Sequence, residues 1–175
     1  MKKPILAAVL CSLLLAPAVA LADGPVNLAL FNPVQIVKED QSVTALRISL
    51  LYGRNVDMQG LDLSLVGRNT GDFMGVQFAA VGMVVGDFTG LQNTWLAAMT
   101  NGNMQGLQWA AYTHAGLGSS GVQLGLVNTA DDFSGLQFGL VNIAESMRSG
   151  LQIGLVNIIN NKEKLKVFPI VNWKF

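Results

Sequence analysis

The feature that most constrains the fold of this chain is a repeat of about fifteen residues. Each unit begins with Gly, continues with Leu or Val, and usually has Gln next. The units start at Gly60, Gly75, Gly90, Gly106, Gly121, Gly135 and Gly150. The clearest copy, at residues 135–142, is Gly-Leu-Gln-Phe-Gly-Leu-Val-Asn. A fixed period of this kind indicates a fold that is built by repeating one structural unit.

Each unit is predicted to be a β-strand followed by a turn, because its residues alternate between two faces with a period of two. A helix is disfavoured, since a Gly inside a helix costs about 1 kcal/mol relative to Ala. One face is bulky and apolar, and it includes Leu61, Leu63, Leu65, Trp95, Trp109, Leu136, Phe138, Leu140, Leu151, Ile153 and Leu155. The other face carries Gln77, Gln92, Gln108, Gln123, Gln137 and Gln152.

Ten strands are expected, starting near residues 26, 44, 60, 75, 90, 106, 121, 135, 150 and 166. In a β-solenoid each repeat would be one coil, and the Gln residues would stack in a parallel ladder. In an antiparallel meander each repeat would be a strand plus a hairpin turn, and the meander would close into a β-barrel of about ten strands. We favour the barrel, because strands of about ten residues match the length that crosses a bilayer when tilted. A fifteen-residue coil would also be too narrow inside for Trp95, Trp109 or Phe138.

In the barrel the bulky face would point to lipid and the Gln face would fill a narrow lumen. Two features oppose it: the connections are short for an outer-membrane barrel, and Asn128, Asn142 and Asn157 fall on the apolar face, where they would have to lie near an interface. A small soluble barrel or sandwich therefore stays open. The alternating Val171, Trp173 and Phe175 resemble the terminal strand that the outer-membrane assembly machinery recognises, although an ordinary last strand has the same pattern.

Residues 1–22 are predicted to be a secretory signal peptide, and residues 23–175 a single repeat-built β domain. Lys2 and Lys3 form the positive n-region, and an apolar segment follows up to the small-x-small cleavage site at residues 20–22. The only cysteine, Cys11, lies inside this signal, so we expect no disulfide and no thiolate metal site in the mature chain.

The composition excludes two classes of protein. Eleven Lys+Arg balance eleven Asp+Glu, so the chain lacks the basic surface of a nucleic-acid binder. With 51% hydrophobic and 13% charged residues, it also lacks the composition of a disordered protein.

Few residues suggest chemistry, and we expect no enzyme activity, no cofactor and no catalytic, cofactor-binding or metal-binding residues. His114 lies near Ser119, Ser120 and Asp131 in sequence, but a triad is defined by geometry, and strand-end and turn positions explain these residues better. Residues 116–121 spell the dinucleotide fingerprint Gly-x-Gly-x-x-Gly, yet a strand is expected after it instead of the required helix.

Other polar and aromatic positions have two interpretations. The predicted turns contain four aspartates: Asp72, Asp87, Asp131 and Asp132. They are present either because Asp favours turns or because they bind Ca²⁺ together at a rim. The preference of Asp for turns is the better explanation. The Gln series lines a lumen for a polar solute or, in the favoured interpretation, fills the interior. Arg47, Arg68 and Asp62 share the Gln face and suggest an internal ion pair that plugs a pore. Large apolar residues precede several repeat starts, and they form either an interfacial girdle or a set of hairpin caps. These residues are Phe73, Phe88, Met104 and Phe133.

Most of the chain from residue 26 onward resembles the uncharacterised bacterial surface-repeat proteins, which are exported and carry tandem Gly-Leu-Gln-x-Gly-Leu-Val-Asn units. The matching flanking segments are Pro-Val-Gln at residues 33–35, Leu-Arg-x-x-Leu-x-Tyr-Gly at 46–53 and Pro-Ile-Val-Asn-Trp at 169–173. The middle, at residues 93–99 and 110–114, departs from the pattern. The resemblance implies a surface or envelope location, and it implies no activity because the family has no established one.

These observations predict a non-enzymatic protein of the bacterial cell envelope, with a structural or surface-interaction role and the lipid of the outer membrane as its partner. The alternative is an exported soluble β-repeat module, periplasmic or on the cell surface, that binds a partner through one apolar face.

Overall fold

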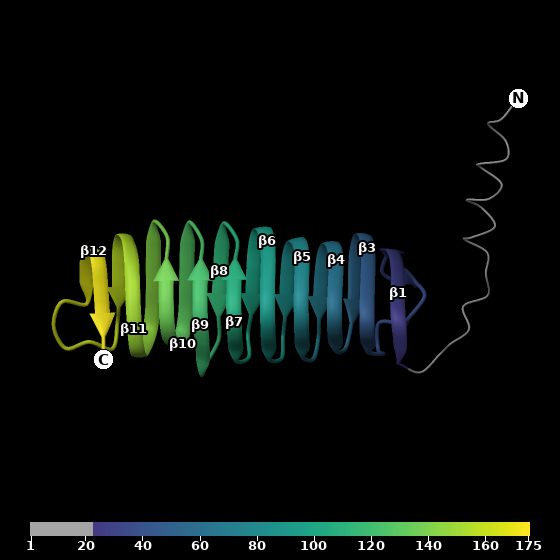
Figure 1. Cartoon of the computed structure of the whole chain (residues 1–175), viewed down its shortest axis with the longest axis horizontal. Coiled ribbons are helices and arrows are strands. Elements are labelled where there is room, and N and C mark those ends of the chain that lie inside the picture. The colour runs from purple at the N-terminus through teal and green to yellow at the C-terminus, as the bar shows by residue number, and fades with distance from the viewer. Residues whose placement is uncertain (1–22) are drawn as a thin grey trace, which may run out of the picture.

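The computed structural model of the chain describes residues 23–175, which wind into a β-solenoid of about nine turns (Figure 1). The signal peptide predicted at residues 1–22 lies outside the described residues. The strands are β1 (Gly24–Phe31), β2 (Val34–Gln35), β3 (Val43–Asn55), β4 (Met58–Asn69), β5 (Phe73–Val84), β6 (Phe88–Thr100), β7 (Met104–Trp109), β8 (Tyr112–Ala115), β9 (Ser119–Leu124), β10 (Val127–Phe138), β11 (Val141–Ile159) and β12 (Val167–Lys174).

Successive coils pair in parallel, and the repeat glycines lie in register along the whole stack. Gly60 pairs with Gly75, and the same register continues coil by coil to Gly150. Among the described strands, only the pairs β1–β2 and β11–β12 are antiparallel. The all-β prediction is confirmed, whereas the antiparallel barrel is wrong and the solenoid alternative is the fold observed.

The fold is a coil because each strand bends in its middle. In β5 the bend lies at Ala79–Ala80, where the pairing register with β6 shifts, and in the later coils it lies at Gly125–Leu126 and Gly139–Leu140. Each coil therefore has two long sides, joined by this bend and by the turn that precedes the next repeat. The narrow interior does not have to hold the large aromatic side chains, because they point outward: Trp95 is 78% exposed.

The repeat glycines are required by the close stacking of the coils. Gly106 has a φ of +132°, in a region that favours glycine, and a Cβ built on it would overlap the backbone carbonyl oxygen of Gly90. The repeat glycines from Gly75 onward stack in the same way on the glycine one coil before, and Gly60 stacks on the backbone of Ala45. This contact explains why the first position of the unit is Gly.

A stack of large apolar side chains fills the interior next to the turns. It consists of Val43, Met58, Phe73, Phe88, Met104, Phe133 and Met147, all buried. The rings of Phe73 and Phe88 stack with their centroids 5.3 Å apart. The proposed girdle or hairpin caps of Phe73, Phe88, Met104 and Phe133 are therefore wrong: these side chains form the core, because the residue two positions before each of their glycines faces inward. At Gly150 the register shifts by one residue, and Met147 takes the inward position.

The centre of the coil is filled by a ladder of glutamine side chains. Gln92 donates a hydrogen bond from Nε2 to Oε1 of Gln77 over 2.8 Å, and the pattern continues through Gln108, Gln123, Gln137 and Gln152 at 2.7–3.0 Å. All six side chains are fully buried. The filler interpretation of the Gln series is confirmed, since stacking in register supplies the partner that each buried amide needs.

An internal ion pair ends this ladder near the N-terminus. Gln77 donates to Asp62 over 2.7 Å, and Asp62 accepts two further bonds from Arg47, at 2.8 Å from Nε and 2.7 Å from Nη2. Both charged side chains are completely buried. The predicted internal ion pair of Arg47 and Asp62 is confirmed, but Arg68 contributes only a backbone carbonyl, and the packed coil has no lumen for the pair to plug.

Asparagine side chains form a second ladder, on the side of the coil that follows the bend. Asn128 donates to Asn142, and Asn142 donates to Asn157, each over 2.7 Å. These three side chains are fully buried, so their predicted position near an interface is wrong. The bend moves the alternation by one residue, and the side chains that period two places outside therefore face the core.

Both ends of the solenoid are covered. At the N-terminal end β2 folds back on β1, and at the C-terminal end β12 runs antiparallel to β11. Lys162 in the loop before β12 donates to Asn172 over 2.7 Å and lies 5.7 Å from the ring centroid of Trp173. Val171 and Trp173 therefore belong to a capping strand, which carries Pro169, and Phe175 follows that strand. Capping of this kind blocks end-to-end pairing of sheets.

Candidate functional site

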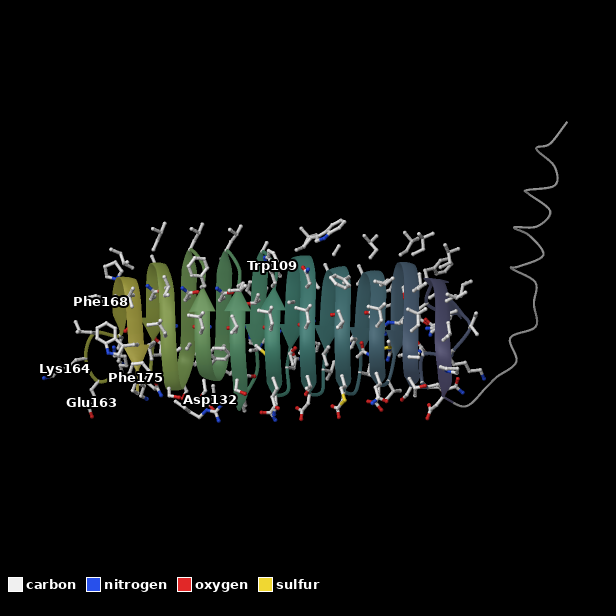
Figure 2. All side chains as sticks on the ribbon, in the orientation of Figure 1. Trp109, Asp132, Glu163, Lys164, Phe168 and Phe175 are labelled. Carbon is white, nitrogen blue, oxygen red and sulfur yellow. The ribbon has the colours of Figure 1, made fainter. Side chains whose placement is uncertain are left out.

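The most distinctive surface of the solenoid is a row of exposed apolar side chains along the bends. We call it the apolar ridge, and it consists of Leu50, Leu51, Leu65, Trp95, Leu96, Leu126, Leu140 and Leu155. Leu126 is 56% exposed and Leu155 is 68% exposed. The bends stack because the coils are in register, so the side chains that project from them form one line (Figure 2), in which two coils contribute only the alanines Ala80 and Ala111.

The outer surfaces on both sides of the ridge are also apolar. On one flank the residue three positions after each repeat Gly points outward, and all but one of these residues are apolar: Leu63, Phe78, Asn93, Trp109, Leu124, Phe138 and Ile153. On the other flank the first outward residue after the bend is Tyr52, Val66, Val81, Ala97, Tyr112, Val127, Val141 or Val156. The charged side chains Arg54 and Arg68 lie two residues farther from the ridge on this second flank. The ridge and these two rows contain no charged residue.

The opposite edge of the coil carries a row of aspartates, with Val85 and Leu117 as exposed apolar residues in its turns. Its turns contain Asp57, Asp72 and Asp87; Asp132 belongs to β10, and Figure 2 shows it on the same edge, away from the ridge. Asp72 accepts a hydrogen bond from the backbone nitrogen of Asp87 over 2.8 Å, and Asp57 accepts one from Asp72 over 2.8 Å. These aspartates thus link successive turns, and Asp132 pairs with Arg148 at 3.1 Å. Residues 23–175 hold no group of three potential metal ligands.

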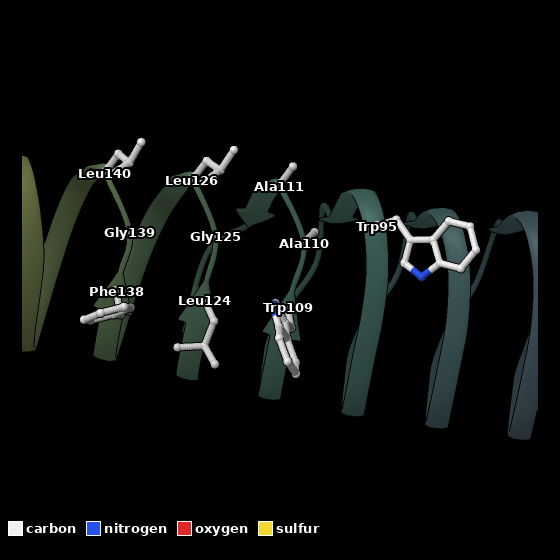
Figure 3. Close-up of a pocket in the computed structure, with 10 residues that line it drawn as sticks. All are labelled: Trp95, Trp109, Ala110, Ala111, Leu124, Gly125, Leu126, Phe138, Gly139 and Leu140. Atoms are coloured by element: carbon white, nitrogen blue, oxygen red, sulfur yellow. The ribbon is translucent and has the colours of Figure 1, made fainter.

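A shallow apolar hollow of about 570 Å³ lies beside the ridge (Figure 3). Its floor consists of Ala110, Ala111, Gly125 and Gly139, where small residues leave space between neighbouring coils. Six larger apolar side chains surround the floor, namely Trp95, Trp109, Leu124, Leu126, Phe138 and Leu140. Figure 3 shows Leu126 and Leu140 projecting from the bend above the row of Trp109, Leu124 and Phe138.

The backbone donors of the hollow are already used within the coil. Gly125 donates from its backbone nitrogen to Phe138, Gly139 donates to Ile153, and Leu126 donates to Ala111, over 2.9–3.1 Å. A ligand in the hollow would therefore contact hydrocarbon, the indole rings of Trp95 and Trp109, and peptide groups whose N–H is already hydrogen-bonded. The chemistry that fits this site is apolar, because no free backbone N–H there is available to select a polar group.

The residues considered for catalysis are not brought together. His114 lies on an outer flank, where Nδ1 is 3.1 Å from the Thr129 hydroxyl. Ser119 is buried, and its hydroxyl donates to the Gly116 carbonyl and accepts from the Met104 backbone nitrogen. No hydrogen bond among the described residues joins His114 to Ser119, Ser120 or Asp131. The fingerprint at residues 116–121 leads into strand β9, as expected from the sequence.

The sequence identified most of this surface but not its shape. The bulky face was expected outside and the Gln face inside, and this division is confirmed for the side of each coil that precedes the bend. Leu50, Leu51, Leu96 and Leu126 were missed as members of one surface, because they lie in the bends, where period-two alternation is interrupted. The signal that could have found them is the pair of adjacent small or apolar residues in the middle of each unit.

Comparisons of the chain with protein-family models, with curated proteins and with solved structures found no match. The resemblance to bacterial surface-repeat proteins therefore stays a prediction. Within residues 23–175 there is no helix with the length and apolar character needed to cross a membrane.

Proposed function

We propose that this chain is a non-enzymatic, exported protein of the bacterial cell envelope that attaches to its partner through the apolar ridge. The observation that carries the proposal is the continuous, uncharged ridge with apolar flanks on both sides. Contiguous apolar patches larger than a few hundred Å² are rare on soluble monomers and mark interaction sites. The predicted signal peptide and the resemblance to surface-repeat proteins support the envelope as the location, with the outer membrane as the compartment we favour.

The distribution of the polar groups supports an interaction role over a chemical one. The buried amides are committed to ladders, and the one histidine is bonded to Thr129. What the chain presents outside is a long, regular surface whose side chains are mostly leucine, valine and aromatic residues. A surface of this kind contributes binding energy through the area that it removes from water.

The proposal predicts that envelope attachment depends on the ridge. In cells that express the full chain, the wild-type protein should pellet with the envelope fraction, resist a high-salt wash and be released by detergent. The triple variant Leu126→Glu, Leu140→Glu, Leu155→Glu should lose at least about tenfold of its pelleted fraction, because burying one leucine contributes about 1.5–3 kcal/mol.

The matched control is Gln59→Glu, Thr89→Glu, Gln105→Glu, which adds the same charge at exposed positions beside the acidic edge. It should pellet like the wild type. Circular dichroism of both variants verifies that the β-structure is retained. Equal pelleting of the folded ridge variant and the wild type would show that the ridge has no role in attachment.

A further inference from the structure

We infer that the apolar ridge inserts into the acyl layer of a lipid bilayer, so that the solenoid lies along the membrane surface with its acidic edge in water. The inference rests on the proposed function and names the partner of the same surface. Three properties of the surface carry it: the distribution of charge, the shape of the ridge and the chemistry of the hollow.

The charge distribution fits a hydrocarbon layer better than a polar partner. The ridge and the first row on each flank carry no charged side chain, whereas aspartates line the opposite edge. Without Lys2 and Lys3, residues 23–175 hold nine Lys+Arg against eleven Asp+Glu, so attraction to anionic headgroups cannot be the main source of binding. The partner that this surface complements is uncharged and apolar.

The shape of the ridge argues against a second copy of this chain as the occupant. With about 4.8 Å between coils the ridge is roughly 35 Å long, and it is only one or two side chains wide. It therefore offers on the order of 400 Å² to a flat partner, against about 800 Å² per partner in a standard protein interface. Contact along one flank would leave the ridge and the other flank in water. A fluid acyl layer covers a convex ridge and both of its flanks together.

The hollow and the aromatic residues match this placement. The hollow has a mostly apolar lining and satisfied backbone donors, so an acyl chain can lie across Gly125 and Gly139 without leaving a backbone N–H unpaired. Trp109 lies on one flank below the ridge (Figure 3), and Tyr112 is in register with Ala97 and Val127 on the other flank. Tryptophan and tyrosine are enriched at the level of lipid headgroups, and interfacial elements bury their apolar face about 5–10 Å deep.

Vesicle binding tests the inference directly. The protein, exported and processed by the expressing bacterium, carries Trp173→Phe so that its emission comes from Trp95 and Trp109. It is mixed with phosphatidylcholine vesicles whose acyl chains are brominated, and fluorescence and co-sedimentation are measured. We expect quenching of both tryptophans and binding that persists in about 0.5 M NaCl, because screening acts on charges and not on acyl contacts.

The ridge variant Leu126→Glu, Leu140→Glu, Leu155→Glu should partition at least about tenfold less, and the acidic-edge control should partition like the wild type. Binding that requires anionic lipid and disappears in salt would overturn the inference, as would dimers in detergent-free solution that depend on the ridge and do not bind vesicles. If the protein does not bind the vesicles but its pelleting with the envelope still depends on the ridge, the inference of a lipid partner is wrong and the proposed function stands. If neither depends on the ridge, both are wrong.

Discussion

Replacing Arg47 with methionine is expected to lower the free energy of unfolding by about 3–5 kcal/mol, because it leaves the fully buried carboxylate of Asp62 without its counterion. The remaining donors to Asp62 are the Gln77 amide and the Ser64 hydroxyl. Neither carries a charge, so they cannot replace the guanidinium. Urea denaturation of the wild type and the variant measures the difference.

A second substitution at Asp62 should rescue this variant. Asp62 occupies the position that holds Gln in the later coils, and its partner in register on the next coil is Gln77. In Arg47→Met, Asp62→Gln the ladder would continue through a neutral amide that accepts from Gln77. We expect the double variant to recover most of the lost stability, since replacing both members of a buried ion pair is often neutral. A loss below about 1 kcal/mol in the single variant would contradict this account of the pair.

Replacing Gly106 with valine is expected to prevent the coils from stacking around it. The substitution combines a φ of +132°, at a cost of about 1–3 kcal/mol for a non-glycine residue, with a Cβ that overlaps the carbonyl oxygen of Gly90. That oxygen belongs to the backbone of the neighbouring coil and cannot rotate away. We therefore expect a loss of more than about 3 kcal/mol, measured by thermal and urea unfolding.

The matched control is Gln105→Val, which places the same side chain one residue earlier in β7 at an exposed position. Its stability should stay within about 0.5 kcal/mol of the wild type, because surface substitutions without a specific contact have small effects. If Gly106→Val unfolded like Gln105→Val, the repeat glycines would not be required by coil stacking.

Much of the fold could be predicted from the sequence. Repeat glycines separated by about fifteen residues indicated the repeating unit, and alternation from Leu136 to Phe138 indicated strands with Gln137 on the opposite face. Those residues are in register and on the expected faces because side-chain direction in a strand follows the pleat. The internal pair of Arg47 and Asp62 also followed from their position on the Gln face.

The choice between coil and barrel could not be made from period two alone, since a strand has the same alternation whether its neighbour is parallel or antiparallel. What distinguishes them is the bend at Gly139–Leu140, which shifts the alternation by one residue. The asparagines on the apolar face were the sign of this shift: Asn142 shares the face of Leu140 on a straight strand, but it faces inward after the bend while Leu140 is exposed. The core position of Phe133 was missed because it was assigned to a turn.

The solenoid places its residue types in an unusual order from inside to outside. Amide side chains occupy the centre, where an isolated amide would lose its hydrogen bonds with water. Stacking in register removes that penalty, because every rung supplies both a donor and an acceptor. Because amides fill the centre, the leucines lie at the bend and on the outer surface. Regular stacking is thus the common cause of the polar interior and of the continuous apolar ridge.

Engineered cysteine pairs test directly whether the fifteen-residue coils stack in parallel. Gln59 and Met74 are exposed partners on adjacent coils, in register, so their Cα atoms should be about 4.8 Å apart, within the range that a disulfide spans. With Cys11 changed to serine, the variant Gln59→Cys, Met74→Cys should form an internal disulfide on mild oxidation. The pair Gln59→Cys, Thr89→Cys, two coils apart, should not. An antiparallel meander would place Gln59 and Met74 at opposite ends of neighbouring strands, so failure of the first pair to bridge in the folded protein would contradict the solenoid.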